Sequence, residues 1–216
     1  MSASGVMNVD PLLRQRLMQG ANTLGVGLSE SACDDLLAYL ELMARWNKVV
    51  NLTAIQEPAE LVTRHILDSL AVLPYLAAGR IVDVGTGAGL PGIPLTIVSG
   101  RPITLLDRSH KRMGFLTEAV ARLALSRVDL QCARVEDFRP KELYDVVLTR
   151  AFASLADVVK STAHLLAPHG VILAMKGARP TEEITTVVAP FVVRATHELM
   201  VPGLDARRHV VEVVRL

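Results

Sequence analysis

The chain has 216 residues, 50% of them hydrophobic, and its 23 basic and 22 acidic side chains give a formal net charge of +1. This length suits one sizeable α/β domain with a small extension. The near-neutral charge excludes a uniformly basic nucleic-acid binder, so any RNA contact requires basic side chains gathered on one face.

The cysteine content and the hydropathy pattern indicate the cellular compartment of the protein. Cys33 and Cys132 are the two cysteines, and they lie far apart with no metal-ligand spacing. So few cysteines indicate a reduced, cytoplasmic protein. The sequence contains no apolar run of about 18 residues, so we expect no membrane span. Its first residues lack a basic start followed by an apolar stretch, so we expect no secretory signal.

Residues 10–76 are predicted to be helical. A short amphipathic helix is expected from Asp10 to about residue 24, and Ser29 is a candidate N-cap for a second helix with a regular apolar stripe. A third helix is expected to begin near Pro58 and to end near Pro74. We expect this N-terminal helical extension, residues 1–76, to pack beside a larger domain at residues 77–216.

From residue 80 onward, short β-type runs alternate with helical segments. Strands are expected at 81–84, 103–106, 128–133, 144–148 and 171–175, with helices at 90–99, 109–125 and 155–166 and a turn at 168–170. This alternation predicts an α/β fold with a mostly parallel sheet and right-handed crossovers. Two β-branched runs, 192–201 and 210–214, are separated by Pro202 and Gly203 and predict an antiparallel hairpin at one sheet edge.

The strongest chemical signal is a glycine-rich turn that follows the strand at 81–84. It contains Gly85, Gly87 and Gly89, and an acidic residue, Asp83, precedes it. A dinucleotide fingerprint would have glycine where Leu90 stands, and the next residue is proline, which weakens an anion nest. The acidic-x-Gly-x-Gly-x-Gly pattern is instead typical of class I methyltransferases, whose cofactor has no phosphate. In them the acidic residue orders the loop or receives the methionine amino group.

A second acidic residue, Asp107, ends the next strand. A carboxylate at this position can accept hydrogen bonds from both ribose hydroxyls of a nucleoside cofactor. NAD-dependent enzymes use the same device, so Asp107 indicates a nucleoside without identifying it. The alternative role is to cap the helix that begins near Ser109.

Several segments together resemble one family, the bacterial 16S rRNA guanine-N7 methyltransferases (RsmG, also called GidB). The resemblance spans most of the chain, and the double-proline extension of the glycine loop and the 64–70 segment are its most specific parts. The segments that carry it are 46–53 (WNKVVNLT), 64–70 (RHILDSL), 83–94 (DVGTGAGLPGIP), 106–107 with Lys111 and Arg112, 134–136 (RVE), 149–154 (TRAFAS), 176–177 and 208–209.

The resemblance implies a Rossmann-like methyltransferase domain with a seven-stranded sheet, helices on both faces, and S-adenosylmethionine as cofactor. It also implies the role of each matching residue. Arg150 is the expected catalytic residue, close to both cofactor and guanine. The cofactor-binding residues are expected to be Gly85, Gly87, Leu90, Asp107, Val135, Glu136 and Arg150, and the RNA-contacting candidates are Arg64, His65, Lys111, Arg112 and Lys176.

Each of these residues also has a structural interpretation. Arg150 fits a structural ion pair, and Lys111 and Arg112 fit an ordinary solvated helix face. His65 is more typical of a hydrogen-bonded packing residue than of a catalyst, and Lys176 suits structure as well as RNA contact. For Asp68, in the same segment as His65, we expect a structural pairing with Arg64 or with a backbone group.

The expected reaction is methyl transfer to N7 of a guanine in a decoding-region loop of 16S rRNA, with S-adenosylhomocysteine as product. Guanine N7 carries no proton, so no general base is required. The sequence contains no metal-ligand cluster and no Pro-Cys motif. We expect a monomer with the small ribosomal subunit as partner and no obligate protein partner. The alternatives are a non-catalytic assembly factor that binds S-adenosylmethionine or rRNA, a methyltransferase with another target, and a nicotinamide-dependent oxidoreductase.

Overall fold

The computed structural model describes residues 10–150 and 153–216. Two expectations fall partly outside this range. The absence of a secretory signal concerns residues 1–9, and the 149–154 segment includes Ala151 and Phe152. Within the described residues, no helix is long and apolar enough to cross a membrane.

The N-terminal helices begin where the sequence predicts them. Helix α1 (Pro11–Thr23) is capped by the Asp10 carboxylate, and α2 (Glu30–Asn47) is capped by the Ser29 hydroxyl, each accepting a hydrogen bond from a first-turn N–H. Such caps satisfy backbone donors that have no partner inside the helix. The two predicted helix starts are therefore confirmed.

The predicted third helix is broken into several turns. It consists of α3 (Pro58–Leu61), the π-helical turn η1 (Val62–Leu67) and α4 (Asp68–Leu70), and the short 3-10 turn η2 (Leu73–Tyr75) follows. π-Helical turns are rare and occur mostly near functional sites. This one carries Arg64 and His65, two of the candidate residues.

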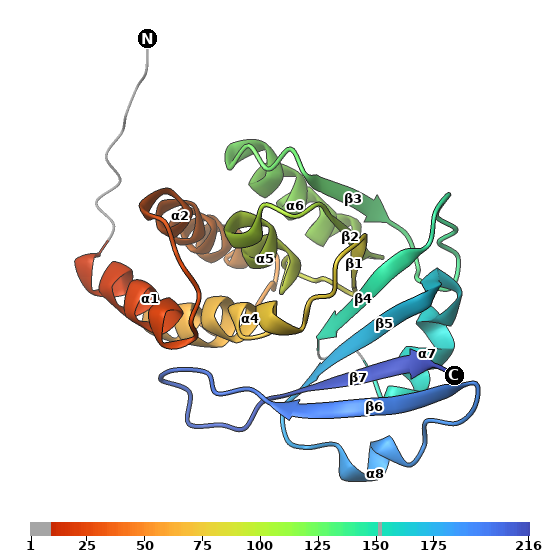
Figure 1. Cartoon of the computed structure of the whole chain (residues 1–216). Coiled ribbons are helices and arrows are strands. Elements are labelled where there is room, and N and C mark those ends of the chain that lie inside the picture. Colours follow the sequence, from red (N-terminus) through yellow and green to blue (C-terminus); the bar gives the residue numbers. More distant parts are fainter. Residues whose placement is uncertain (1–9, 151–152) are drawn as a thin grey trace.

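A seven-stranded sheet forms the centre of the molecule (Figure 1). Its strand order is β3-β2-β1-β4-β5-β7-β6, with parallel pairing from β3 to β5 and antiparallel pairing of β7 with β5 and β6. The predicted mostly parallel sheet with an antiparallel C-terminal hairpin is thus confirmed. The strands are β1 (Ile81–Val84), β2 (Ile103–Asp107), β3 (Val128–Cys132), β4 (Tyr144–Arg150), β5 (Leu166–Lys176), β6 (Phe191–Glu198) and β7 (His209–Arg215).

Helices cover both faces of the sheet because the central strands are apolar on both sides. In β1, Ile81 belongs to one apolar cluster, while Val82 and Val84 belong to the other. The first cluster also contains the cores of α1 and α2, so the N-terminal helices share one core with the sheet. That face carries the N-terminal helices, α5 (Gly92–Ser99) and α6 (His110–Arg122), and the other carries α7 (Leu155–Thr162), the 3-10 turn η3 (Ala163–Leu165) and α8 (Thr181–Ile184).

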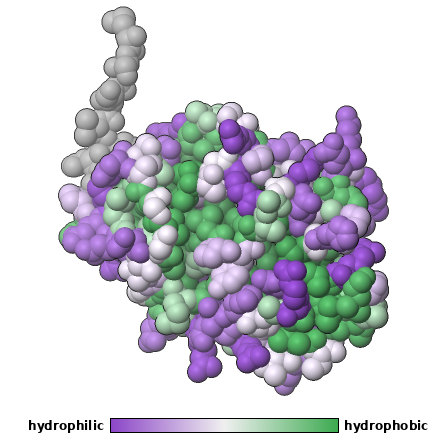
Figure 2. Space-filling view, viewed as in Figure 1, coloured by the Kyte–Doolittle hydropathy of each residue, from purple (hydrophilic) through white to green (hydrophobic). Residues whose placement is uncertain are grey.

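The surface is mixed, and in the view of Figure 2 hydrophobic residues gather in more than one area. Hydrophobic atoms gather over the β6–β7 hairpin (Figure 2), where Val188 and Val192 are exposed. Strand β6 forms that edge of the sheet.

Several element boundaries differ from the expectation, and two of the differences have a clear structural cause. The helix expected at 90–99 begins at Gly92, because Gly89 and Leu90 first close hydrogen-bonded turns onto the Thr86 carbonyl. The turn expected at 168–170 lies inside β5, which begins at Leu166. There the pairing with β4 shifts in register and accommodates extra residues as a bulge.

Candidate active site

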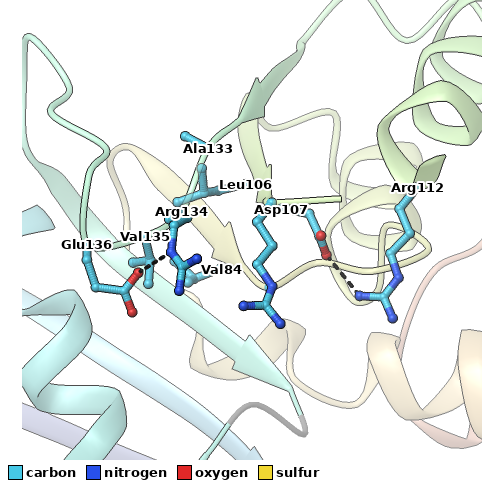
Figure 3. A pocket seen from close by; sticks show the side chains of 10 residues that line it. Val84, Leu106, Asp107, Arg112, Ala133, Arg134, Val135 and Glu136 are labelled. Atoms are coloured by element: carbon cyan, nitrogen blue, oxygen red, sulfur yellow. Dashed lines mark hydrogen bonds and ion pairs between the residues drawn. The ribbon is translucent and has the colours of Figure 1, made fainter. Parts of the chain in front are cut away.

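Strands β1, β2 and β3 end around one cavity, where the glycine loop, the connection from β2 to α6 and the loop from β3 to β4 meet. Its volume is about 380 Å³, within the range of small-molecule sites. Figure 3 shows side chains from all three connections facing this space. The lining residues are Val84, Gly85, Leu106, Asp107, Arg108, Arg112, Ala133, Arg134, Val135 and Glu136.

Asp107 organises this cavity. It is the last residue of β2, and its carboxylate is 4% exposed. Its Oδ2 atom accepts the Gly87 N–H at 2.9 Å, and its Oδ1 atom accepts the Ser109 N–H at 2.9 Å. Arg112 Nη1 lies 3.4 Å from Oδ2 (Figure 3). The carboxylate therefore fixes the glycine loop and the start of α6 while facing the space that a nucleoside would occupy.

The glycine loop itself is held by Asp83. This residue is fully buried in β1, and its Oδ2 atom accepts the Thr86 hydroxyl at 2.7 Å and the Gly92 N–H at 2.9 Å. Gly87 has a φ of +60°, a left-handed conformation that favours glycine. A Cβ at Gly92 would meet Asp83 Oδ2 at 2.9 Å, so this glycine lets the helix start approach the carboxylate.

The other oxygen of Asp83, Oδ1, is buried without a hydrogen-bond partner among the described residues. Burial raises the pKa of this carboxyl to about 6, against the lowering effect of the Thr86 and Gly92 hydrogen bonds and of the Arg150 charge. Asp83 therefore orders the loop with one oxygen and retains an unsatisfied acceptor, Oδ1, beneath the glycine loop.

The opposite wall of the cavity follows β3. Val135 is buried, while Glu136 is exposed and lies 4.0 Å from Arg134 Nε (Figure 3). We did not expect Arg134 or Arg108 to line this cavity. Arg108 belongs to the basic cluster at 108–112, and Arg134 is in the 134–136 segment, so both had a sequence signal without an assigned role.

A second cavity, of about 400 Å³, lies at the carboxyl ends of β4 and β5 beside the π-helical turn. Arg150 at the end of β4 donates from Nη1 to Asp68 Oδ2 at 3.1 Å and to the Arg64 carbonyl at 3.2 Å. Arg208 donates from Nε to Asp68 Oδ1 at 2.8 Å. Asp68 therefore pairs with Arg150 and Arg208, and our expectation of a pairing with Arg64 was wrong.

His65 lines the same cavity and is almost fully buried. Burial, together with the nearby Arg150 charge, lowers its pKa to about 4, so the imidazole is neutral near pH 7. The ring nitrogens lie 3.1 Å from the Arg64 carbonyl and 2.8 Å from the Thr53 hydroxyl. With both nitrogens engaged, the ring holds the segment around residue 53 against the π-helical turn.

The remaining candidates are placed differently. Lys176 lines the second cavity, but its ammonium group donates to the Ala153 carbonyl at 2.6 Å and to Glu183 at 2.7 Å. Arg64 also lines it and pairs with Glu60 at 3.7 Å. Lys111 is exposed on the first turn of α6 and lines neither cavity, and Leu90 is buried behind the loop.

Helix α2 supports the loop from the other side. The Tyr39 hydroxyl, which is fully buried, donates to the Ala88 carbonyl. Burial raises the pKa of this phenol, so the hydroxyl stays protonated as the donor. The N-terminal extension therefore contacts the glycine loop through Tyr39 and lines the second cavity with Asp68.

Comparison with known proteins identifies the family. The model of the family "rRNA small subunit methyltransferase G" (GidB) matches residues 32–211. The chain belongs to this family. It is 46% identical to the ribosomal RNA small subunit methyltransferase G of Laribacter hongkongensis, covering 93% of this chain and 98% of that protein, and 46% identical to the Azoarcus sp. relative, covering 93% and 95%.

Solved structures with a similar fold include a methyltransferase. The chain matches Thermus thermophilus TrmN with a TM-score of 0.57 and 21% identity, over 72% of this chain and 53% of that one. It matches the glycopeptide N-methyltransferase MtfA, solved with S-adenosylhomocysteine, with a TM-score of 0.61 and 13% identity, over 70% and 87%. These similarities confirm the Rossmann-like methyltransferase fold.

The groups around the first cavity are chemically compatible with S-adenosylmethionine. The Asp107 carboxylate can accept hydrogen bonds of the kind that a ribose diol donates, Val135 is an apolar lining residue, and Asp83 Oδ1 is an unsatisfied acceptor beside the glycine loop. Among the described residues no group of three His, Cys, Asp or Glu side chains has a metal-binding arrangement.

Proposed function

We propose that this protein transfers the methyl group of S-adenosylmethionine to N7 of one guanine in a decoding-region loop of 16S rRNA, with S-adenosylhomocysteine as product. The observation that carries the proposal is the pair of adjacent cavities at the carboxyl ends of β1 to β5, in a chain that belongs to the rRNA small subunit methyltransferase G family. The first cavity suits the nucleoside cofactor, and Arg150 lines the second.

In the first cavity, residues of the chain bind and orient the cofactor. Asp107 receives the ribose hydroxyls, the backbone around Val135 and the Glu136 side chain hold adenine, and Gly85 and Gly87 let the backbone approach closely. Leu90 packs behind the loop and fixes its shape. The bound cofactor supplies a methyl group on a positively charged sulfur, which makes the methyl carbon electrophilic.

The second cavity positions the acceptor guanine, and no proton transfer is required of its residues. Guanine N7 presents a lone pair and has no proton to remove, so a general base is not required. This agrees with His65, whose ring nitrogens both lie within hydrogen-bond distance of protein groups. Catalysis then rests on holding N7 about 3 to 3.5 Å from the methyl carbon.

Arg150 is the residue that contacts the acceptor. Its Nη1 atom is held by Asp68 and the Arg64 carbonyl, and its side chain borders the cavity at 21% exposure. An arginine is a suitable partner for the O6 acceptor of guanine. Because N7 must remain open to the methyl group, Arg150 binds O6 or a neighbouring phosphate.

Basic residues around the cavities provide the contact with RNA. Lys111 is exposed, and Arg64 and Arg112 are each 43% exposed, so these three are available to phosphate groups. Lys176 would contact RNA only by leaving Glu183. The RNA must present an accessible loop, because the A-form major groove hides guanine N7.

We further propose that the enzyme acts as a monomer on the small ribosomal subunit in the cytoplasm. The near-neutral net charge supports assembled subunits as substrate, because affinity for naked RNA depends on many basic contacts.

The proposal is tested with methyl-labelled S-adenosylmethionine and purified protein. Small subunits from a strain lacking this methyltransferase are compared with large subunits and with protein-free 16S rRNA. We expect label in 16S rRNA of the small subunit and none in large subunits. Cofactor binding without label in any RNA would contradict the proposal and favour the non-catalytic assembly factor.

A further inference from the structure

Asp68 lies at the junction of three distant parts of the chain. Its carboxylate is 4% exposed, and it pairs with Arg150 Nη1 at 3.1 Å and with Arg208 Nε at 2.8 Å. These partners are 82 and 140 residues away in the sequence. Asp68 comes from the N-terminal helices, Arg150 from the end of β4, and Arg208 from the residue that precedes β7.

The bonds use only some of the N–H donors of each guanidinium group. Arg150 uses Nη1 for both Asp68 and the Arg64 carbonyl, and Arg208 uses Nε for Asp68 and Nη1 for the Arg207 carbonyl. Toward the described residues, Nη2 of each arginine makes no hydrogen bond. Both arginines line the second cavity, so the remaining donors serve a ligand in it.

The charges support the same interpretation. One carboxylate between two guanidinium groups leaves a single net positive charge, which suits a partly negative acceptor such as a carbonyl oxygen or a phosphate. Without Asp68 the two arginines would repel each other, and each long side chain would have several rotamers to choose from. Asp68 therefore reduces the repulsion between Arg150 and Arg208 and restricts the rotamers of both side chains.

The π-helical turn explains how Asp68 reaches this place. Its hydrogen bonds span five residues rather than four, so it changes the direction of the residues that follow relative to an uninterrupted α-helix. It ends at Leu67, directly before Asp68, and it presents the Arg64 carbonyl to Arg150. The rare backbone turn thus supplies one acceptor for Arg150, the Arg64 carbonyl, and the residue directly after it, Asp68, supplies the other.

We propose that Asp68 is a positioning residue for methyl transfer, holding Arg150 and Arg208 as a two-arginine cradle for the acceptor guanine. This inference rests on the proposed function and adds Asp68 and Arg208 to the residues that serve it. The N-terminal helices thereby take part in building the acceptor cavity, because Asp68 and the Arg64 carbonyl both come from them.

The test is a double-mutant cycle between Asp68→Asn and Arg150→Ala, measured as kcat and KM for small subunits. We expect Asp68→Asn to lower kcat by roughly 10- to 100-fold, because a charge-assisted hydrogen bond is lost, while the Kd for S-adenosylmethionine changes by less than about twofold. In the Arg150→Ala background the same substitution should lower kcat by clearly less than in the native background, because only its effect through Arg208 remains. A merely structural role would instead give the full loss in both backgrounds, which would overturn the proposal.

Arg208 provides a second route if Asp68→Asn fails to fold. Arg208→Ala should lower kcat at unchanged cofactor affinity. The matched control is Arg207→Ala, since Arg207 is an exposed neighbour whose backbone carbonyl, the partner of Arg208, is retained. Equal activity of Arg208→Ala and Arg207→Ala would contradict a role of Arg208 in holding the acceptor guanine.

A readout without RNA separates this inference from the proposed function. In nitrogen-15 spectra of the arginine side chains, we expect hindered rotation of the Arg150 guanidinium in the native protein and free rotation in Asp68→Asn. Native protein that methylates no RNA but shows this difference would refute the proposed function alone. Free rotation in the native protein would refute the positioning role of Asp68.

Discussion

The backbone N–H of Gly87 donates to Asp107 Oδ2 at 2.9 Å, and this bond ties the end of β2 to the glycine loop of β1. The carboxylate that suits the ribose diol is thus the group that shapes the adjoining loop. A substitution at Asp107 therefore affects cofactor binding both directly and through the loop.

Replacing Asp107 with Ala should weaken S-adenosylmethionine binding by roughly 10- to 100-fold, since hydrogen bonds to a charged group are lost. Isothermal titration calorimetry measures the change. The control is Asp129→Ala, because Asp129 is an exposed carboxylate on the neighbouring strand β3. A native Kd in Asp107→Ala would disprove the assignment of Asp107 to the cofactor.

Gly92→Ala should destabilise the protein by about 1–3 kcal/mol, the usual effect of overpacking a core. Its Cβ would lie 2.3 Å from Leu105 Cδ2 and 2.9 Å from Asp83 Oδ2, both fully buried side chains. Urea denaturation gives the change in unfolding free energy. Gly27→Ala serves as the comparison, because a Cβ there meets nothing within 4 Å; equal stability of both variants would refute the close packing.

His65 should make the protein sensitive to acid. Its folded pKa of about 4 lies below the ordinary value of 6.5, so its contribution to stability is present above pH 6.5 and is lost as the pH falls toward 4. From pH 7.5 to pH 5 this loss amounts to about 2 kcal/mol. His65→Gln should lose correspondingly less unfolding free energy over that interval than native protein.

The control for this measurement is His169→Gln, at an exposed histidine in β5. Its acid sensitivity should match that of the native protein. If His65→Gln also matched it, the imidazole would not be the buried neutral group that the structure indicates.

Arg150→Ala should lower the rate of methyl transfer strongly while the cofactor Kd and the fold stay close to native, because the residue acts on the acceptor side. Single-turnover kinetics with small subunits measure the rate. Arg122→Ala is the control, since it removes an exposed guanidinium in the last turn of α6 that lines neither cavity. A near-native rate of methyl transfer in Arg150→Ala would contradict the catalytic role of Arg150.

Much of the fold follows from local sequence. The strand cores, the caps at Asp10 and Ser29, and the C-terminal hairpin depend on neighbouring residues, so periodicity and capping rules suffice to predict them. The glycine loop is of the same kind, because Asp83, Gly87 and Gly92 lie within ten residues of one another.

The features that sequence reasoning missed depend on tertiary contacts. Asp68 pairs with Arg150 and Arg208 rather than with the nearby Arg64. Asp68 and Arg208 are 140 residues apart, so no local sequence pattern predicts their pairing. The π-helical turn at 62–67 is likewise fixed by packing rather than by propensity. The start of β5 at Leu166 was missed because Pro168 and Gly170 indicate a turn, whereas the sheet accommodates them as a bulge.

The most direct test of the central claim is to map the methyl group itself. After reaction with small subunits, 16S rRNA is reduced and treated with aniline, which cleaves the chain at N7-methylguanosine. The account predicts a single cleavage site, in a decoding-region loop, that appears with native protein and is strongly reduced with Arg150→Ala. Label that resists this cleavage, or that resides on another base or in a ribosomal protein, would contradict methyl transfer to guanine N7.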